Sequence, residues 1–346
     1  MNLAATTLPG RGLRVIALVA SFLAAVGWTL PARTAVVPSR SEGVLAVDGI
    51  EMTVDDLDGS LAFYRDVLDF RADEPKESHG DPVERRTGVF GAGLRSVRMR
   101  LGTESIVLTE FLAPKGRPFP REAHSNDRSF QHLAIVVSDM ERAYERLRVA
   151  KVRAISTSPQ TLPDWNAAAG GIRAFYFRDP DGHPLEVIQF PAGKGASRWQ
   201  EKERLFLGID HTAITVADTD RSLAFYRDIL GFEAKGESRN WGPEQERLNM
   251  VFGASLRITT LRAPSGPGVE LLEYLAPGDG ADMPRDEAAN DLLHRHTTIV
   301  VDDLGRLLPG LRERGIGMIG GAETTTEGRA MRFRDPDGHV LEAIER

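Results

Sequence analysis

Alternation of apolar and polar positions marks several strands in this chain, and a helix pattern follows each of them. The clearest strands are rich in Ile, Val and Thr, end in Asp and occupy His132–Asp139, His211–Asp218 and His296–Asp303. These residue types favour strands, and the Asp is a typical helix N-cap. In the best-defined helix, apolar residues recur at i, i+3 and i+7 from Leu223 to Leu230, and we expect Gly231 to end it.

Further short strands follow each helix. The alternating segment GVELLEYLAP at Gly268–Pro277 closes one such unit, and RAMRFRDPDGHVLEAIE at Arg329–Glu345 closes the next. The DPDG sequence inside the second segment is typical of a hairpin turn. We therefore predict a repeating unit of one strand, one helix and three strands (βαβββ), present four times.

An internal duplication organises the chain at a larger scale. The heptapeptide SLAFYRD occurs at Ser60–Asp66 and Ser222–Asp228, and FRDPDGH occurs at Phe177–His183 and Phe333–His339. Because the motifs recur in the same order, the chain is a tandem repeat. The predicted organisation is a first copy at residues 44–190, a linker at 191–204 and a second copy at 205–346.

Composition narrows the classes of protein that fit this pattern. Hydrophobic residues make up 41% and charged residues 27% of the 346 residues, which is typical of a folded, water-exposed chain. A net charge of −7 without long runs of one sign argues against a nucleic-acid partner. The chain has no cysteine, so a metal would have to be held by His, Asp or Glu.

The N-terminus has the layout of a secretory signal. The uncharged run Val15–Leu30 is preceded by two arginines and followed by Ala32 and Ala35. We expect residues 1–35 to be a signal peptide or, alternatively, an N-terminal membrane anchor. The expected location is secreted or periplasmic, with no membrane partner unless this segment is retained.

The repeated motifs resemble those of the vicinal oxygen chelate superfamily, which includes glyoxalase I, epimerases, extradiol dioxygenases and antibiotic-resistance proteins. In the second copy the resemblance rests on IDHTAITVAD, SLAFYRDILGF, VELLEYLAP, RHTTIVVDD and FRDPDGHVLEAI. It implies an α+β fold of two tandem modules, in which each pair of βαβββ half-repeats forms an incomplete barrel. It does not define the reaction, because family members with these motifs differ in chemistry.

The resemblance also implies a metal site in the second copy, held by His211, Glu270, His296 and Glu342. Alternation supports this choice, since Val269 and Leu271 share one strand face and leave Glu270 on the other. On the last strand, Glu342 likewise lies on the face opposite its apolar neighbours. This mixed N/O donor set suits one divalent ion: Zn, Ni, Co, Mn or Fe(II).

The first copy departs from this pattern. Gly49 matches His211 and Val107 matches Glu270, whereas His132 and Glu186 remain, so the first copy is interpreted as degenerate. Glu51 is a candidate substitute ligand on the same strand face as Gly49.

Half-repeats of this superfamily can also pair across modules. His211 and Glu270 would then be completed by His132 and Glu186. The short linkage within each copy favours local closure, which is the arrangement we expect.

The expected function is that of a metal-dependent lyase or isomerase of the glyoxalase or epimerase type, acting on a small carbonyl or diol substrate. The metal would stabilise an enolate, and Glu270 or Glu342 would act as the catalytic base. The alternatives are an extradiol-type dioxygenase and a non-catalytic, resistance-type binding protein. His183 and His339 in the DPDGH motifs are expected to be solvated, and His294 to be a surface residue.

Overall fold

The computed structural model of the chain describes residues 43–325 and 328–346. Six α helices and eighteen strands lie in this part of the chain, together with the short 3-10 helix η1 (Ser197–Gln200). No helix among the described residues is long and apolar enough to span a membrane. The expected signal segment, residues 1–35, lies outside the described residues.

The first copy contains two half-repeats, each of which begins with a strand and a helix and ends in a hairpin. The first comprises β1 (Val44–Val54), α1 (Leu57–Asp66), β2 (Arg71–Ala72), β3 (Lys76–His79), α2 (Asp81–Thr87), β4 (Gly93–Leu101) and β5 (Glu104–Ala113). The second comprises β6 (Gln131–Val137), α3 (Met140–Val149), β7 (Arg153–Ala154), β8 (Gln160–Thr161), β9 (Arg173–Arg178) and β10 (Pro184–Gln189).

The second copy repeats this order. Its first half-repeat comprises β11 (Phe206–Val216), α4 (Thr219–Tyr226), β12 (Glu233–Trp241), α5 (Pro243–Asn249), β13 (Ser255–Arg262) and β14 (Gly268–Ala276). Its second comprises β15 (Arg295–Val301), α6 (Leu304–Glu313), β16 (Met318–Thr325), β17 (Gly328–Arg334) and β18 (Val340–Glu345).

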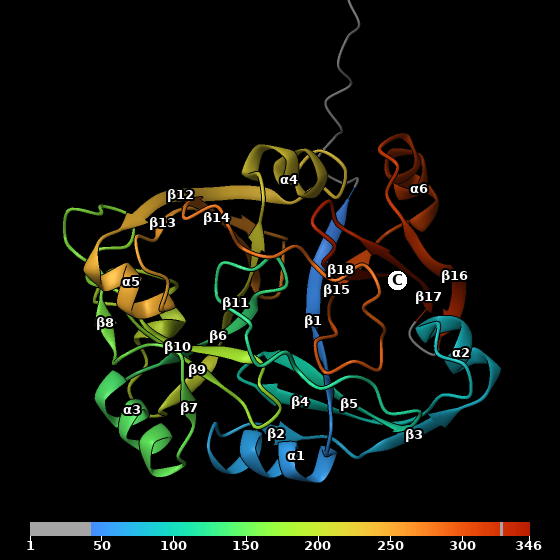
Figure 1. Cartoon of the computed structure of the whole chain (residues 1–346), viewed down its shortest axis with the longest axis horizontal. Helices are drawn as coiled ribbons and strands as arrows, with labels where there is room; N and C mark the ends of the chain where they lie inside the picture. Colours follow the sequence, from blue (N-terminus) through green and yellow to red (C-terminus); the bar gives the residue numbers. More distant parts are fainter. Residues whose placement is uncertain (1–42, 326–327) are drawn as a thin grey trace, which may run out of the picture. The chain divides into compact units, whose positions relative to one another are not determined.

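The half-repeats pair across the two copies. Sheet A has the strand order β16-β17-β18-β15-β1-β5-β4-β2, with β3 also paired to β4. Sheet B has the order β12-β13-β14-β11-β6-β10-β9-β7, with β8 also paired to β9. In Figure 1 the blue strand β1 therefore lies between the orange β15 and the teal β5. Each sheet combines one half-repeat from each copy, which is the exchanged arrangement.

Chain connectivity permits this exchange. The segment between the half-repeats of the first copy, residues 114–130, is about as long as the linker that joins β10 to β11. Strand β11 pairs antiparallel with β6, on the side of β6 opposite to β10. Because the two connections have similar lengths, linkage length does not select local closure here.

The two main helices of each copy nevertheless pack into one apolar core. Residues of α1 and α3 pack in one apolar cluster with strands of both sheets, including Leu57, Tyr64 and Leu147. A second cluster combines α4 and α6 in the same way and includes Tyr226, Leu307 and Leu311. A copy thus packs together through its helices while its strands belong to two different sheets.

The repeated motifs join the two half-repeats of each copy. The buried Tyr64 hydroxyl of SLAFYRD donates to Asp179 of the DPDGH turn over 3.0 Å. In the second copy the Tyr226 hydroxyl donates to Asp335 over the same distance. These bonds satisfy buried polar groups in both copies, which explains why the motifs recur as a pair.

The Asp N-caps expected from the sequence are present. The carboxylates of Asp139, Asp218 and Asp303 accept from backbone N–H groups in the first turns of α3, α4 and α6. Helix α4 ends at Tyr226, earlier than expected, because Leu230 N–H bonds to Phe225 five residues back instead of continuing the α pattern. Leu230 stays buried at the end of this wider turn, and Gly231 follows with a φ of 83°.

Candidate metal centre and ligand cavity

Sheet B brings two histidines and two glutamates to one place. His211 on β11 and Glu270 on β14 come from the second copy, and His132 on β6 and Glu186 on β10 come from the first. His132 and Glu270 are both cross-strand partners of Ala213 on β11. His132 lies on the neighbouring strand β6 and Glu270 on the other neighbour, β14. Three of the four side chains are almost fully buried, and Glu270 is partly exposed.

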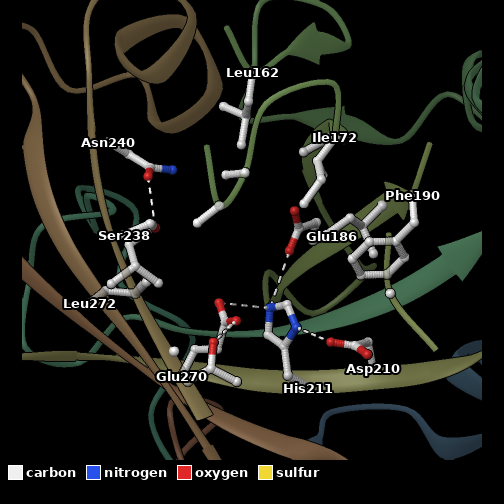
Figure 2. A pocket seen from close by; sticks show the side chains of 18 of the residues that line it. Leu162, Ile172, Glu186, Phe190, Asp210, His211, Ser238, Asn240, Glu270 and Leu272 are labelled. Carbon is white, nitrogen blue, oxygen red and sulfur yellow. Dashed lines mark hydrogen bonds and ion pairs between the residues drawn. The ribbon is translucent and has the colours of Figure 1, made fainter. Parts of the chain in front are cut away.

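The donor atoms of these side chains converge. The Nε2 atom of His132 lies 3.4 Å from Nε2 of His211 and 3.0 Å from a Glu186 oxygen. His211 Nε2 lies 3.6 Å from Glu186 and 3.4 Å from Oε2 of Glu270. Figure 2 shows Glu186 and Glu270 directed at the His211 ring from two sides.

This donor set fits a divalent cation. Two imidazole nitrogens that face each other within 3.4 Å compete for a single hydrogen, whereas both can donate a lone pair to a metal. Two neutral imidazoles and two carboxylates supply an N/O set whose charge balances a divalent ion. Atoms of His132, Glu186 and His211 lie within 4.8 Å of one another, as in a metal-ligand group.

Asp210 fixes the orientation of His211. Its Oδ2 atom lies 2.9 Å from Nδ1 of His211, which directs Nε2 toward the donor cluster. Arg262 binds both oxygens of Asp210, at 3.1 and 2.9 Å, and the buried Trp199 indole donates to Oδ1 over 3.0 Å. The linker helix η1 that carries Trp199 therefore supports a residue of the candidate metal site.

Electrostatics in the cluster favour a bound cation. Burial opposes a charged imidazole, yet Glu270, Asp210 and Glu186 raise the pKa of His211 to about 10. Burial raises the pKa of Glu186, but hydrogen bonds from His132 and His211 outweigh it and hold that pKa below its ordinary value. The Glu186 carboxylate is thus ionised and attracts positive charge to the point where the two Nε2 atoms meet.

The other two sequence-predicted ligands, His296 and Glu342, lie in sheet A. His296 Nε2 is 3.6 Å from Glu342 and 3.5 Å from Glu51, the substitute ligand considered for the first copy. The buried Arg332 guanidinium donates to Glu342 Oε1 over 2.9 Å and lies 3.4 Å from His296 Nε2. Burial and Arg332 lower the pKa of His296. A fixed cation therefore occupies the centre of this second cluster.

The structure thus separates the four predicted ligands into two pairs. His211 and Glu270 meet His132 and Glu186, whereas His296 and Glu342 meet Glu51 and Arg332. The first of these groups follows from the sequence if the half-repeats pair across the two copies, which was the alternative to local closure. What it did not reveal was which pairing the sheets adopt, or that Arg332 fills the second cluster.

The faces expected from strand alternation are confirmed. Val269 and Leu271 pack in the cluster of α4, whereas Glu270 lines a cavity. Leu341 and Ala343 pack in the same helical cluster, and Glu342 faces His296.

Three other histidines differ from expectation. His183 and His339 are buried, at 0% and 4% exposure, because their Nε2 atoms bond to the carbonyls of Leu292 and Thr215. His294 is also buried, beside Glu287. The DPDGH turns are therefore part of the interior and are not solvated.

A cavity of about 500 Å³ opens above the donor cluster of sheet B. Glu186, His211 and Glu270 lie at its base, and apolar side chains cover much of its wall (Figure 2). Phe190, at the end of the first copy, contributes to the lining, as do four linker residues: Gly195, Ala196, Arg198 and Trp199. The candidate metal site is therefore open to a small molecule.

Comparison with known proteins identifies the family. The family model described as the Glyoxalase/Bleomycin resistance protein/Dioxygenase superfamily matches residues 46–187 and 208–343. The chain belongs to this superfamily, and the resemblance inferred from the motifs is confirmed. Members of this family use a divalent metal, and the donor cluster of sheet B is a candidate for it.

Two curated relatives match stretches of the chain that are about as long as one copy. A 2-epi-5-epi-valiolone epimerase from Actinomyces sp. is 34% identical over 156 residues, which cover 44% of this chain and 82% of that protein. The metallothiol transferase FosB of Shouchella clausii is 28% identical over 137 residues, covering 39% of this chain and 77% of the relative.

Solved structures match over both copies. Glyoxalase I from Zea mays has a TM-score of 0.58 at 15% identity, covering 88% of this chain and 92% of that one. A putative dioxygenase from Bacillus subtilis has a TM-score of 0.55 at 17% identity, covering 88% and 86%. At these identities the similarity supports the fold, which is confirmed as α+β with two tandem modules.

Proposed function

We propose that the protein is a divalent-metal-dependent isomerase of the epimerase type, which moves a proton at the carbon next to a carbonyl group. The observation that carries this proposal is the convergence of His132, Glu186, His211 and Glu270 at the base of an open cavity. These four residues would hold the metal. When bound, it would polarise the substrate oxygens and stabilise an enolate.

Glu270 is the best-placed proton acceptor. Its side chain is 19% exposed, compared with 5% for Glu186, and it lines the cavity. The Thr260 hydroxyl donates to Oε1 of Glu270 over 2.8 Å and fixes the carboxylate orientation from the neighbouring strand. A carboxylate that reaches the cavity can contact a substrate carbon, which general base catalysis requires.

Glu342, the other catalytic candidate from the sequence, is less suited to this role. It is bound to Arg332 and lines a different cavity, of about 390 Å³, in sheet A. Burial raises its pKa, but the charge of Arg332 and the His296 contact hold that pKa well below its ordinary value. An ion-paired carboxylate of low pKa is a weak base.

One relative supports proton transfer as the reaction class. The epimerase from Actinomyces sp. is 34% identical over a region that covers 82% of that protein. A dioxygenase would instead keep metal coordination positions open for oxygen, and a fourth protein donor such as Glu270 reduces that space.

Exchange of substrate protons with solvent tests this proposal. The metal-loaded protein is incubated with hydroxyketones in anaerobic deuterium oxide, and NMR follows loss of the proton next to the carbonyl. Glu270→Gln is expected to lower the exchange rate at least about 100-fold. The matched control Glu237→Gln changes an exposed carboxylate of the same cavity outside the donor cluster and should retain the rate.

Other results would redirect the proposal. Oxygen uptake with catechols that survives Glu270→Gln would favour a dioxygenase. Equal exchange by Glu270→Gln and the unchanged protein would exclude Glu270 as the base.

A further inference from the structure

A cavity of about 940 Å³ lies beside the DPDGH turn of the second copy, and no residue of the donor cluster lines it. Its walls come from α4, from the segments before β6 and β15, and from the α6–β16 and β17–β18 turns. Five arginines line this space: Arg128, Arg221, Arg285, Arg314 and Arg334. This arginine cavity is therefore rich in cations, although the whole chain has a net charge of −7.

Three of these arginines have no carboxylate partner. Arg221 pairs with Asp337 at 2.5 Å, and Arg334 pairs with Glu287 at 2.6 Å. The other three form no ion pair with residues 43–325 or 328–346: Arg128, Arg285 and Arg314.

The carboxylates of the lining do not balance this charge. Asp337 is paired with Arg221, and Asp335 accepts from the Tyr226 hydroxyl and from two backbone N–H groups. Asp282 is exposed and forms no ion pair in the described part of the chain. Three unpaired arginines and one unpaired carboxylate leave the described lining with a net positive charge.

Arg128 carries a buried donor without an acceptor. Its Nε has no hydrogen-bond partner among the described residues, and its Nη1 donates to the Asn126 carbonyl over a long 3.4 Å. A buried N–H group that lacks an acceptor costs free energy, so an anionic group beside Arg128 would stabilise the protein.

The first copy provides an internal comparison, because it has the same half-repeats without these cations. Positions are matched by counting from SLAFYRD, from IVV and from the strand histidines His132 and His296. The first copy then has Gly59 in place of Arg221, Ala150 in place of Arg314 and Leu292 in place of Arg128. The repeated fold therefore does not require the three arginines.

The corresponding space in the first copy is also filled by larger side chains. A Cβ placed on Gly182 would lie 3.0 Å from Arg153 and 3.2 Å from Phe119. The second copy has Gly317 in place of Arg153 and Met283 in place of Phe119. The second copy thus combines smaller side chains at these positions with added positive charge.

We infer that the arginine cavity binds a small organic anion with two or more negative charges, carried by phosphate or carboxylate groups. Guanidinium groups from separate segments, such as those of Arg128 and Arg314, form charge-assisted hydrogen bonds to several oxyanions at once. Phe225 and Ile316 line the same space and would pack on the carbon part of the ligand. The negative charge of the whole chain disfavours a long polyanion. This site is independent of the proposed function.

Calorimetric titration of the full chain tests the inference, with pyrophosphate, citrate and acetate as probes. We expect one pyrophosphate or citrate per chain, bound at least about tenfold more tightly than acetate. Tighter binding of pyrophosphate would indicate a phosphorylated ligand, and tighter binding of citrate a polycarboxylate. Because both probes also chelate metals, the titrations are repeated with His132→Ala, in which binding should be unchanged.

Two variants that introduce the first-copy residues locate the site. Arg314→Ala and Arg128→Leu should each weaken binding of the preferred probe at least about fivefold. Arg312→Ala is the matched control, because Arg312 is an exposed arginine two residues before Arg314 that does not line the cavity. The control removes the same charge and should bind as the unchanged protein does.

Four results would each overturn the inference. They are equal affinity for acetate and the multivalent probes, unchanged binding in both Arg314→Ala and Arg128→Leu, an equal loss in Arg312→Ala, and loss of binding in His132→Ala. The last result would place the anion at the donor cluster. None of these measurements depends on proton exchange, so the proposed function would stand.

Discussion

Arg332 in sheet A and Tyr176 in sheet B hold equivalent positions, since each is the cross-strand partner of the glutamate on the last strand of its half-repeat. Arg332 pairs with Glu342, and Tyr176 pairs with Glu186. The guanidinium reaches both Glu342 and His296, whereas Tyr176 packs beside His132, with ring centroids 4.7 Å apart. The cluster of sheet A therefore contains a guanidinium among its donors, whereas the cluster of sheet B has a tyrosine at the equivalent position.

The first prediction concerns metal content. We expect about one divalent ion per chain, because Arg332 already supplies a guanidinium to the cluster of His296 and Glu342, whereas the donor cluster of sheet B is formed by His and Glu side chains. His132→Ala should lower the bound metal severalfold, and the matched variant His296→Ala should leave it unchanged. Metal analysis by mass spectrometry measures both. Local pairing of each copy would give the reverse result.

The second prediction concerns the cation in sheet A. Arg332→Ala leaves Glu51, His296 and Glu342 facing one another, so we expect a loss of about 3 kcal/mol in the free energy of unfolding. The same three side chains then form an open N/O site. Added Zn²⁺ should restore part of the lost stability and raise the bound metal toward two per chain. Calorimetry of the variant with and without Zn²⁺ checks this, and unchanged stability without metal would contradict it.

The sequence was sufficient to predict the half-repeat, the tandem organisation and the facing of Glu270. These features depend on local alternation and on motifs that recur, such as the Asp218 N-cap and the strand that contains Val269 and Leu271. A period-two pattern assigns side chains to faces without reference to the rest of the chain.

The pairing of half-repeats could not be predicted in the same way. The strand β11 presents similar edges to β6 and to β15, because HLAIVVSD and HTTIVVDD have nearly the same pattern. The choice depends on how the helices of each copy pack, and on long-range bonds such as Tyr64 to Asp179. The burial of His183 and His339 has the same origin, since their partners Leu292 and Thr215 are more than 100 residues away in sequence.

The third prediction concerns the support of His211. Asp210→Asn keeps the size of the side chain but removes the charge that holds Nδ1 of the imidazole, so metal affinity should fall about 10- to 100-fold. Trp199→Phe should cause a smaller loss, because Arg262 still binds Asp210. Asp48→Asn is the matched control, since Asp48 precedes Gly49 as Asp210 precedes His211. Competition with a chromophoric chelator measures the affinities, and equal losses in Asp48→Asn and Asp210→Asn would exclude this role.

The fourth prediction concerns the pH dependence of stability, at Glu287. This buried carboxylate accepts from His294 over 2.5 Å and from Arg334 over 2.6 Å. Burial raises its pKa, but His294 and Arg334 outweigh this effect and hold the pKa below the ordinary value. Because the folded-state pKa is lowered, the carboxylate stabilises the fold above its unfolded pKa of about 4.3, and the contribution is lost as pH falls through the lower folded value.

Glu287→Gln should therefore lower the free energy of unfolding by about 3 kcal/mol at neutral pH, and the difference from the unchanged protein should shrink toward zero near pH 3. Urea unfolding at several pH values, with chelator present so that metal release does not contribute, measures the difference. Glu122→Gln is the control, because Glu122 is exposed and should show a small, pH-independent effect. A difference for Glu287→Gln that stays constant between pH 3 and pH 7 would attribute the loss to packing instead of charge.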